Sequence, residues 1–153
     1  MHEILFKAKR IDNGEWVEGH LVTRKYAFNN EVFEAHIITD AYEQYGVMNF
    51  GTTPVLISPV DNDCCFRVDH NTICQYTGLT DKNGNKNWEN DICSTDLERP
   101  FLIVEFRNGG FMYNCNDGKK DYYDIMLPTE PLEQQDKYTE VIGNIFDNKD
   151  LLQ

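Results

Sequence analysis

The sequence predicts a mostly-β protein, in which an N-terminal β-hairpin and sheet region precedes a small barrel-like region. Three observations support this class. Apolar and polar residues alternate along most of the chain, turn-forming Asn-Gly steps recur between these runs, and only one segment has a clear helical pattern. The 153 residues suffice for one ordinary domain, or for two very small ones that share a core.

The first half begins with a predicted hairpin. Apolar residues alternate with lysines over Ile4–Ala8, Asp12–Gly14 is a turn, and Trp16–Val22 supplies the second strand. Further strands are predicted at Val32–Thr39 and Pro54–Ser58. The residues between these two strands fit a short helix or a loop, so the role of residues 24–60 stays open.

The second half contains the strongest turn and hairpin signals. Asn83-Gly84 is expected to hold positive φ at both central positions of a two-residue turn. A hairpin is predicted where Asn108-Gly109-Gly110 separates two apolar runs. The remaining predicted elements are strands at Phe66–Val68, Thr72–Tyr76, Tyr122–Leu127 and Glu140–Phe146, a helix at Thr129–Tyr138, and a helical turn at Asp147–Leu152.

These elements have a recognisable layout. An approach strand, a turn, a hairpin and a returning strand resemble a small Src-homology-3-like barrel. We place a boundary at Pro59–Asp63, which gives an N-terminal β region (1–60) and a barrel-like region (61–153), with one integrated domain (1–153) as the alternative.

Charge and cysteine content limit the function classes. The net charge is −12 and the 14 basic residues form no run, so direct nucleic-acid binding is not expected. Residues 121–153 alone hold eight acids and two bases. Five cysteines, an odd number, fit free thiols in a reducing cytoplasm better than a disulfide framework. The sequence lacks the apolar stretch of a signal peptide or of a membrane span, so no membrane partner is expected.

The sequence motifs that suggest a metal site do not have the ligand spacing that known metal sites require. Cys64 and Cys65 are adjacent, whereas structural zinc sites pair ligands two to four residues apart. An EF-hand loop starting at Asp81 would need glycine at its sixth position and glutamate at its twelfth, but Lys86 and Ile92 stand there. The only serines are Ser58 and Ser94, and neither lies in a nucleophile motif. The sequence therefore predicts no catalytic, cofactor-binding or metal-binding residue, and no cofactor.

One carboxylate pair leaves an alternative open. Glu89 and Asp91 would share a face if they lay on a strand, and such pairs can serve acid–base chemistry or bind a cation.

Three blocks of the sequence resemble the YopX family of phage and prophage proteins. They are HEILFKAKR with GEWVEG at the start, Tyr76–Ile92 (YTGLTDKNGNKNWENDI) in the middle, and Glu140–Phe146 (EVIGNIF) near the end. Asn90 stands where the family has glycine, and asparagine tolerates positive φ better than other non-glycine residues. The resemblance implies a mostly-β protein that a phage or prophage encodes and that is made in the bacterial host cytoplasm. It implies no reaction.

We therefore expect a non-enzymatic accessory protein that acts by protein binding or self-assembly, as a homo-oligomer. Two alternatives stay open: an acidic mimic of DNA that inhibits a host nucleic-acid enzyme, and a metal-dependent hydrolase that uses Glu89 and Asp91. The central block, Asp81–Asp91, is predicted to be structural, as a turn that leads into a strand.

Overall fold

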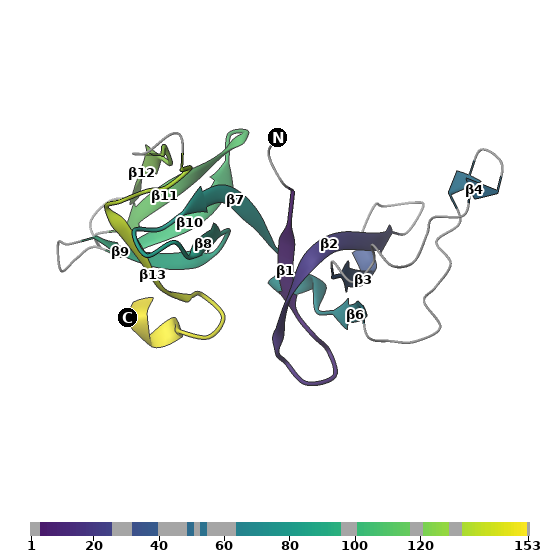
Figure 1. Cartoon of the computed structure of the whole chain (residues 1–153). Helices are drawn as coiled ribbons and strands as arrows, with labels where there is room; N and C mark the ends of the chain where they lie inside the picture. Colours follow the sequence, from purple (N-terminus) through teal and green to yellow (C-terminus); the bar gives the residue numbers. More distant parts are fainter. Residues whose placement is uncertain are drawn as a thin grey trace. The chain divides into compact units, whose positions relative to one another are not determined.

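The computed structural model describes residues 4–25, 32–39, 49–50, 53–54, 64–95, 101–116, 121–128 and 133–152. The described residues are mostly strand, which confirms the predicted class (Figure 1). The chain forms two compact units: unit 1 comprises Met1–Ile4 with Cys74–Gln153, and unit 2 comprises Leu5–Ile73. The division between the units falls after Ile73, whereas the boundary segment expected from the sequence, Pro59–Asp63, lies outside the described residues.

Unit 2 is built on a four-stranded antiparallel arrangement in the order β6-β3-β2-β1. The strands are β1 (Phe6–Lys9), β2 (Trp16–Lys25), β3 (Val32–Ile38) and β6 (Cys65–Val68), and the short 3-10 helix η2 (His70–Thr72) follows β6. The hairpin predicted at the N-terminus and the strands predicted at Val32–Thr39 and Phe66–Val68 are thereby confirmed. A separate two-residue pair, β4 (Asn49–Phe50) with β5 (Thr53–Pro54), contains the start of the strand predicted at Pro54.

The sheet of unit 2 curls so that the end of β1 approaches the end of β6. Arg10, directly after β1, bridges Val68 at the end of β6. The backbone N–H of Asp69 donates to the carbonyl of Lys9 at 2.8 Å, and that of Ile11 donates to the carbonyl of Arg67 at 3.1 Å. One bridge is not a full ladder, so the sheet curls without closing. Its inner face holds a small core of Ala8, Ala35, Ile37 and Val68, each at most 2% exposed.

Unit 1 combines a two-stranded pair with a five-stranded antiparallel sheet in the order β12-β11-β10-β9-β13. The pair is β7 (Cys74–Thr80) with β8 (Lys86–Trp88). The sheet strands are β9 (Asp91–Thr95), β10 (Leu102–Arg107), β11 (Gly110–Asn116), β12 (Asp121–Ile125) and β13 (Thr139–Asn144). The chain then forms the 3-10 turn η3 (Lys149–Leu152), which confirms the predicted helical turn.

One face of the five-stranded sheet carries the core of unit 1. Cross-strand neighbours Cys93 and Leu102, and Val104 and Tyr113, lie on this face together with Leu79 and other apolar residues. Cys93 and Val104 are fully buried. The alternation read from the sequence therefore sorts these side chains to the correct face.

The two turns rich in Asn and Gly belong to different classes. Asn108 and Gly109 have φ of 54° and 85°, as the predicted two-residue hairpin between β10 and β11 requires. In the loop between β7 and β8, Gly84 has a positive φ of 83° but Asn83 does not, so the expectation for Asn83 is wrong. The N–H of Asp81 donates to the carbonyl of Asn85, so three residues form the loop, and within it the N–H of the left-handed Gly84 donates to the carbonyl of Asp81.

The predicted helix over Thr129–Tyr138 is wrong over residues 133–138, the part of it that the structure describes. This segment runs beside β7: the N–H of Thr80 donates to the carbonyl of Gln134, and the N–H of Asp136 donates to the carbonyl of Thr80. Gln134 also has a positive φ of 52°, which a helix does not allow. Bonds to another strand therefore replace the intrahelical bonds that local propensity favoured.

The structure also does not show the barrel expected in the second half. The five-stranded sheet of unit 1 ends at β12 on one side and at β13 on the other, and no pairing joins these strands among the described residues. What is shown is the coarser class, a mostly-β chain with antiparallel sheets.

Candidate binding surface

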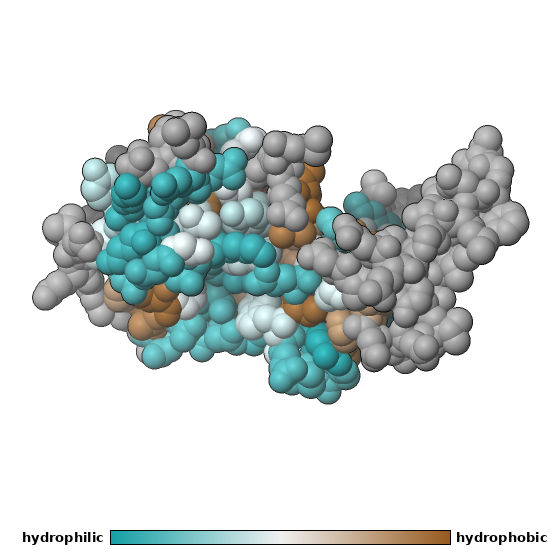
Figure 2. Space-filling model, viewed as in Figure 1, coloured by the Kyte–Doolittle hydropathy of each residue, from teal (hydrophilic) through white to brown (hydrophobic). Residues whose placement is uncertain are grey.

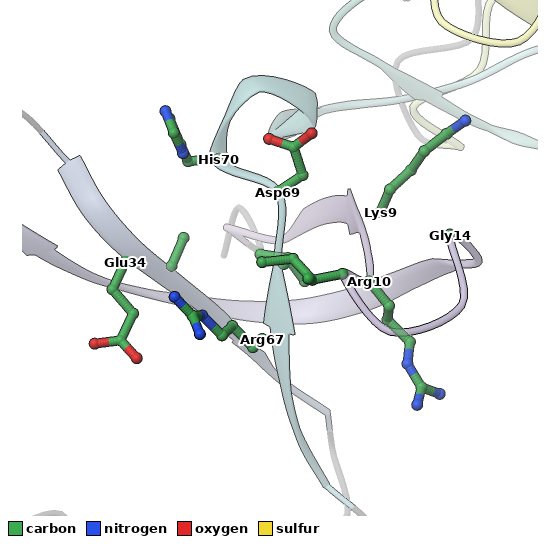
Figure 3. A pocket seen from close by; sticks show the side chains of 10 residues that line it. Lys9, Arg10, Gly14, Glu34, Arg67, Asp69 and His70 are labelled. Atoms are coloured by element: carbon green, nitrogen blue, oxygen red, sulfur yellow. The ribbon is translucent and has the colours of Figure 1, made fainter.

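Unit 2 has an open hollow of about 430 Å³ on its surface, lined by strands β1, β3 and β6 and by the start of η2 (Figure 3). Its floor is apolar and its rim is charged, with more basic than acidic groups. The lining residues are Lys9, Arg10, Ile11, Gly14, Glu34, Ala35, Arg67, Val68, Asp69 and His70. A concave surface that combines an apolar floor with a few charged groups is the usual form of a recognition site.

Two of the charged groups at the hollow are already engaged. The guanidinium of Arg10 donates two hydrogen bonds to the Asp12 carboxylate, at 2.9 and 2.5 Å, and lies 4.3 Å from the centre of the Phe66 ring. Asp69 caps η2, because its carboxylate accepts bonds from the backbone and side chain of Asn71. The bond from the Asn71 N–H is the main reason why the pKa of Asp69 lies below its ordinary value. Arg10 and Asp69 thus shape the hollow more than they offer charge to a ligand.

Arg67 is the group at the hollow that can still receive an anion. It is exposed, and its guanidinium forms no ion pair or hydrogen bond with any residue that the structure describes. In Figure 3 it lies on the same side of β6 as Glu34, while Arg10 points to the opposite side. The register of β3 and β6 also places His36 directly across from Arg67.

The carboxylate of Glu34, which lies on the same side of β6 as Arg67, already has basic neighbours. Glu34 pairs with Arg24 at 3.3 Å and lies 3.8 Å from the imidazole of His36. The exposed His70 adds a further basic ring at the rim. An acidic group that entered beside Arg67 would therefore meet a local excess of positive charge.

The predicted carboxylate pair has a different geometry from the one expected. Glu89 and Asn90 form a turn, Asn90 has a φ of 68°, and β9 begins only at Asp91. Asp91 is 1% exposed and accepts a hydrogen bond from the N–H of Trp88 at 2.8 Å. The expectation that Glu89 and Asp91 share one face of a strand is wrong, because the turn separates them.

Glu89 itself is half-buried. Burial is the main reason why its pKa is raised, and the nearby Glu105 carboxylate raises it further, although a hydrogen bond from the N–H of Gln75 acts the other way. Among the described residues, no group of three or more His, Cys, Asp or Glu side chains is placed to hold a metal ion.

Asp81, the residue that suggested a calcium loop, anchors its own hairpin. Its carboxylate is fully buried and accepts four hydrogen bonds: from the N–H groups of Asn83 (2.9 Å), Asn85 (2.8 Å) and Val141 (3.0 Å), and from the Asn85 amide (3.1 Å). Burial alone would raise the pKa of Asp81, but these bonds outweigh it and the pKa lies below its ordinary value. The central block is therefore structural at this residue.

The cysteines and the described helices add no site. All five cysteines are free thiols, and Cys64, Cys74, Cys93 and Cys115 are buried. No helix in the described part of the chain is long and apolar enough to span a bilayer.

The residues around Arg67 were not singled out from the sequence. Glu34 and His36 alternate along one predicted strand, and Arg67 lies on another, which is the available signal. The register between the two strands could not be read, because a long segment separates them in the sequence.

Comparison with known proteins supports the fold and the family. The chain is similar to the crystal structure of protein EF1440 from Enterococcus faecalis, with 20% sequence identity, a TM-score of 0.53 and coverage of 100% of both chains. At this identity the likeness shows the fold alone. None of the curated proteins compared with this chain matches it. The family described as YopX protein matches residues 5–153, which is essentially the whole chain and includes the central and closing blocks and most of the first block. The chain therefore belongs to the YopX family.

Proposed function

We propose that this YopX-family chain is a phage or prophage accessory protein that acts by binding another protein or by self-assembly, without catalysis, in the cytoplasm of the bacterial host. The hollow of unit 2 is the binding site in this proposal, and its partner is an acidic protein segment. The family membership supports the phage origin only at the level of the family.

One observation carries the proposal: Arg67 stands exposed at a concave surface with no described acidic partner, in a chain whose net charge is −12. While water solvates the guanidinium of Arg67, the unpaired charge carries no desolvation penalty. It gains a strong, oriented hydrogen bond when a carboxylate arrives, because a guanidinium can donate two parallel bonds to one carboxylate.

Several carboxylates of unit 1, in contrast, are used inside the fold. Asp81, Asp91 and Asp136 are each at most 5% exposed, and each accepts hydrogen bonds from described neighbours. Buried, saturated carboxylates cannot line up as phosphate mimics or bind a catalytic cation. This observation favours the binding proposal over the DNA-mimic and hydrolase alternatives, which stay predictions.

The experiment is a capture assay with a matched pair of variants. Tagged wild-type protein, Arg67→Ala and Arg107→Ala are each used to capture partners from a bacterial lysate, and captured chains are identified by mass spectrometry. Arg107 is the control because it is also an exposed arginine at the end of a strand, but in unit 1. We expect the same captured partner with wild type and Arg107→Ala, and its loss with Arg67→Ala. A partner that all three proteins retain would place the binding site elsewhere.

A further inference from the structure

We infer that the hollow of unit 2 receives the C-terminal turn η3 of a second copy of this chain, with an ion pair between Arg67 of one copy and Asp150 of the other. The inference rests on the proposed function and names the partner: the segment that the hollow binds is the protein's own η3, which contributes the carboxylate of Asp150.

The first part of the argument is the charge at each surface. Among the described residues of unit 2, Arg67 is an exposed guanidinium without an ion pair, and Glu34, on the same side of β6, already pairs with Arg24. In unit 1, Asp150 is exposed on η3, and its carboxylate forms no hydrogen bond or ion pair with any described residue. The two groups are complementary, and each lacks a partner among the described residues of its own unit.

The second part is the apolar surface beside each charge. Ile11 lines the hollow and is 58% exposed, above a floor that includes the buried residues Ala35 and Val68. Leu152 projects from η3, two residues after Asp150, and is 44% exposed. Figure 2 shows a hydrophobic patch at this C-terminal turn, on a face of unit 1 that is otherwise mostly hydrophilic. A turn that presents an acid and a leucine together matches a hollow that presents an arginine and an isoleucine.

The third part is the distribution of charge over the chain. Unit 2 contains six basic and ten acidic residues, whereas unit 1 contains eight basic and sixteen acidic residues. The basic rim of the hollow thus lies on the less acidic unit, and η3 lies in the segment 121–153, which has eight acids and two bases. Approach of Asp150 on the C-terminal turn toward Arg67 at the hollow therefore brings opposite local charges together.

A contact of this kind is heterologous, because two different surfaces meet. Each copy offers one hollow and one turn, so one contact leaves a free hollow at one end and a free turn at the other. This property makes the inference testable by complementation between two variants.

The test uses Arg67→Glu and Asp150→Arg, and measures molar mass by light scattering over a concentration series at low salt. We expect wild type to exceed the monomer mass as concentration rises. Each variant alone should need about a tenfold higher concentration to associate, because one lost ion pair at a small contact costs on that order. An equimolar mixture should associate as wild type does, because the intact hollow of one variant meets the intact turn of the other, and the altered hollow and altered turn meet as a reversed ion pair. The double variant Arg67→Glu with Asp150→Arg should associate again, since the reversed pair restores the attraction.

The controls are Arg107→Glu and Glu133→Arg, which reverse exposed charges of the same kinds elsewhere in unit 1. Both should keep the wild-type mass profile, and circular dichroism should show all variants folded because every altered side chain is exposed. A wild type that stays monomeric throughout, or a mixture of the two variants that stays monomeric, overturns the inference. So does a control that dissociates as readily as Arg67→Glu. The proposed function would survive such a result if Arg67→Ala still abolished capture of another protein.

Discussion

Asp81 shows how a single side chain can hold two distant segments. Its Oδ1 accepts from the N–H groups of Asn83 and Asn85 within the hairpin, and its Oδ2 accepts from the N–H of Val141, 60 residues away along the chain. In Asp81→Asn, an amide NH₂ replaces one of these oxygens and faces donors. We expect a loss of about 2–3 kcal/mol in the free energy of unfolding, since hydrogen bonds to a charged acceptor are lost and a donor is left buried. Urea unfolding of wild type and Asp81→Asn measures this difference in the free energy of unfolding. The control is Asp150→Asn, which alters an exposed carboxylate and should leave stability unchanged.

The same residue predicts a pH effect. The pKa of Asp81 is lower in the folded chain than its ordinary value of 3.8, so the unfolded state binds its proton first as pH falls. The stabilisation by the ionised carboxylate is therefore complete above pH 3.8 and is lost as pH falls through the folded pKa. We expect the stability gap between wild type and Asp81→Asn to be constant from pH 7 to about 5 and to narrow below about pH 4. A gap that widens in acid would contradict the depressed pKa.

Glu89 should behave in the opposite sense. Burial first, and then Glu105, raise its pKa above the ordinary 4.5, so the folded state favours the protonated form. This favourable contribution is complete below pH 4.5 and is lost as pH rises toward the folded pKa. Relative to wild type, Glu89→Gln should therefore gain stability between pH 4 and pH 7, by less than about 1 kcal/mol because a half-exposed group is screened by solvent. Chemical denaturation at both pH values measures this. A variant that loses a partner at unchanged stability would instead support a functional role for Glu89.

At the scale of the element, the β7–β8 hairpin depends on its glycine. Gly84 has a φ of 83°, and a Cβ added there would meet no atom within 4 Å, so a substitution is strained by backbone conformation alone. Gly84→Val should therefore cost about 1–2 kcal/mol, since a β-branched residue is forced into the left-handed region. The control is Gly110→Val, at a glycine that also has open space around it but begins strand β11. Thermal melts compare the two, and a Gly84→Val protein that melts like wild type would show that the loop changes class freely.

The elements that local chemistry determines were predictable. Asn108-Gly109 predicts its hairpin because two adjacent positive φ values need these residue types. Asn90 has a positive φ of 68°, which asparagine tolerates better than other non-glycine residues do. The helix predicted at Thr129–Tyr138 is wrong over the described residues 133–138, because distant partners on β7 override local capping signals. The candidate site was missed for a related reason: Arg67 and His36 meet through strand register, which no local pattern encodes.

At the scale of the whole molecule, the proposed self-association should depend strongly on salt. The Debye length falls from about 10 Å at 0.1 M ionic strength to about 3 Å at 1 M, so exposed ion pairs weaken as salt rises. We expect the average molar mass of wild type to fall toward that of the monomer between about 0.05 M and about 1 M salt. Light scattering across this range measures it, with Arg67→Glu as a reference whose mass should barely change. Association that strengthens with salt would indicate an apolar contact instead.

The hydrogen bonds at the outer edge of β13 affect whether the sheet can pair with strands of other chains. A strand at the end of a sheet normally exposes N–H and C=O groups that can recruit a further strand and begin aggregation. Here the carbonyl of Thr139 accepts from the N–H of Lys82, and the N–H of Val141 donates to Asp81. A bulge between Val141 and Gly143 then breaks the register of the strand. The β7–β8 loop therefore covers the edge of β13 and protects the chain against edge-to-edge aggregation. We expect removal of the Asp81 carboxylate to expose this edge and to favour fibre formation, in addition to destabilising the fold.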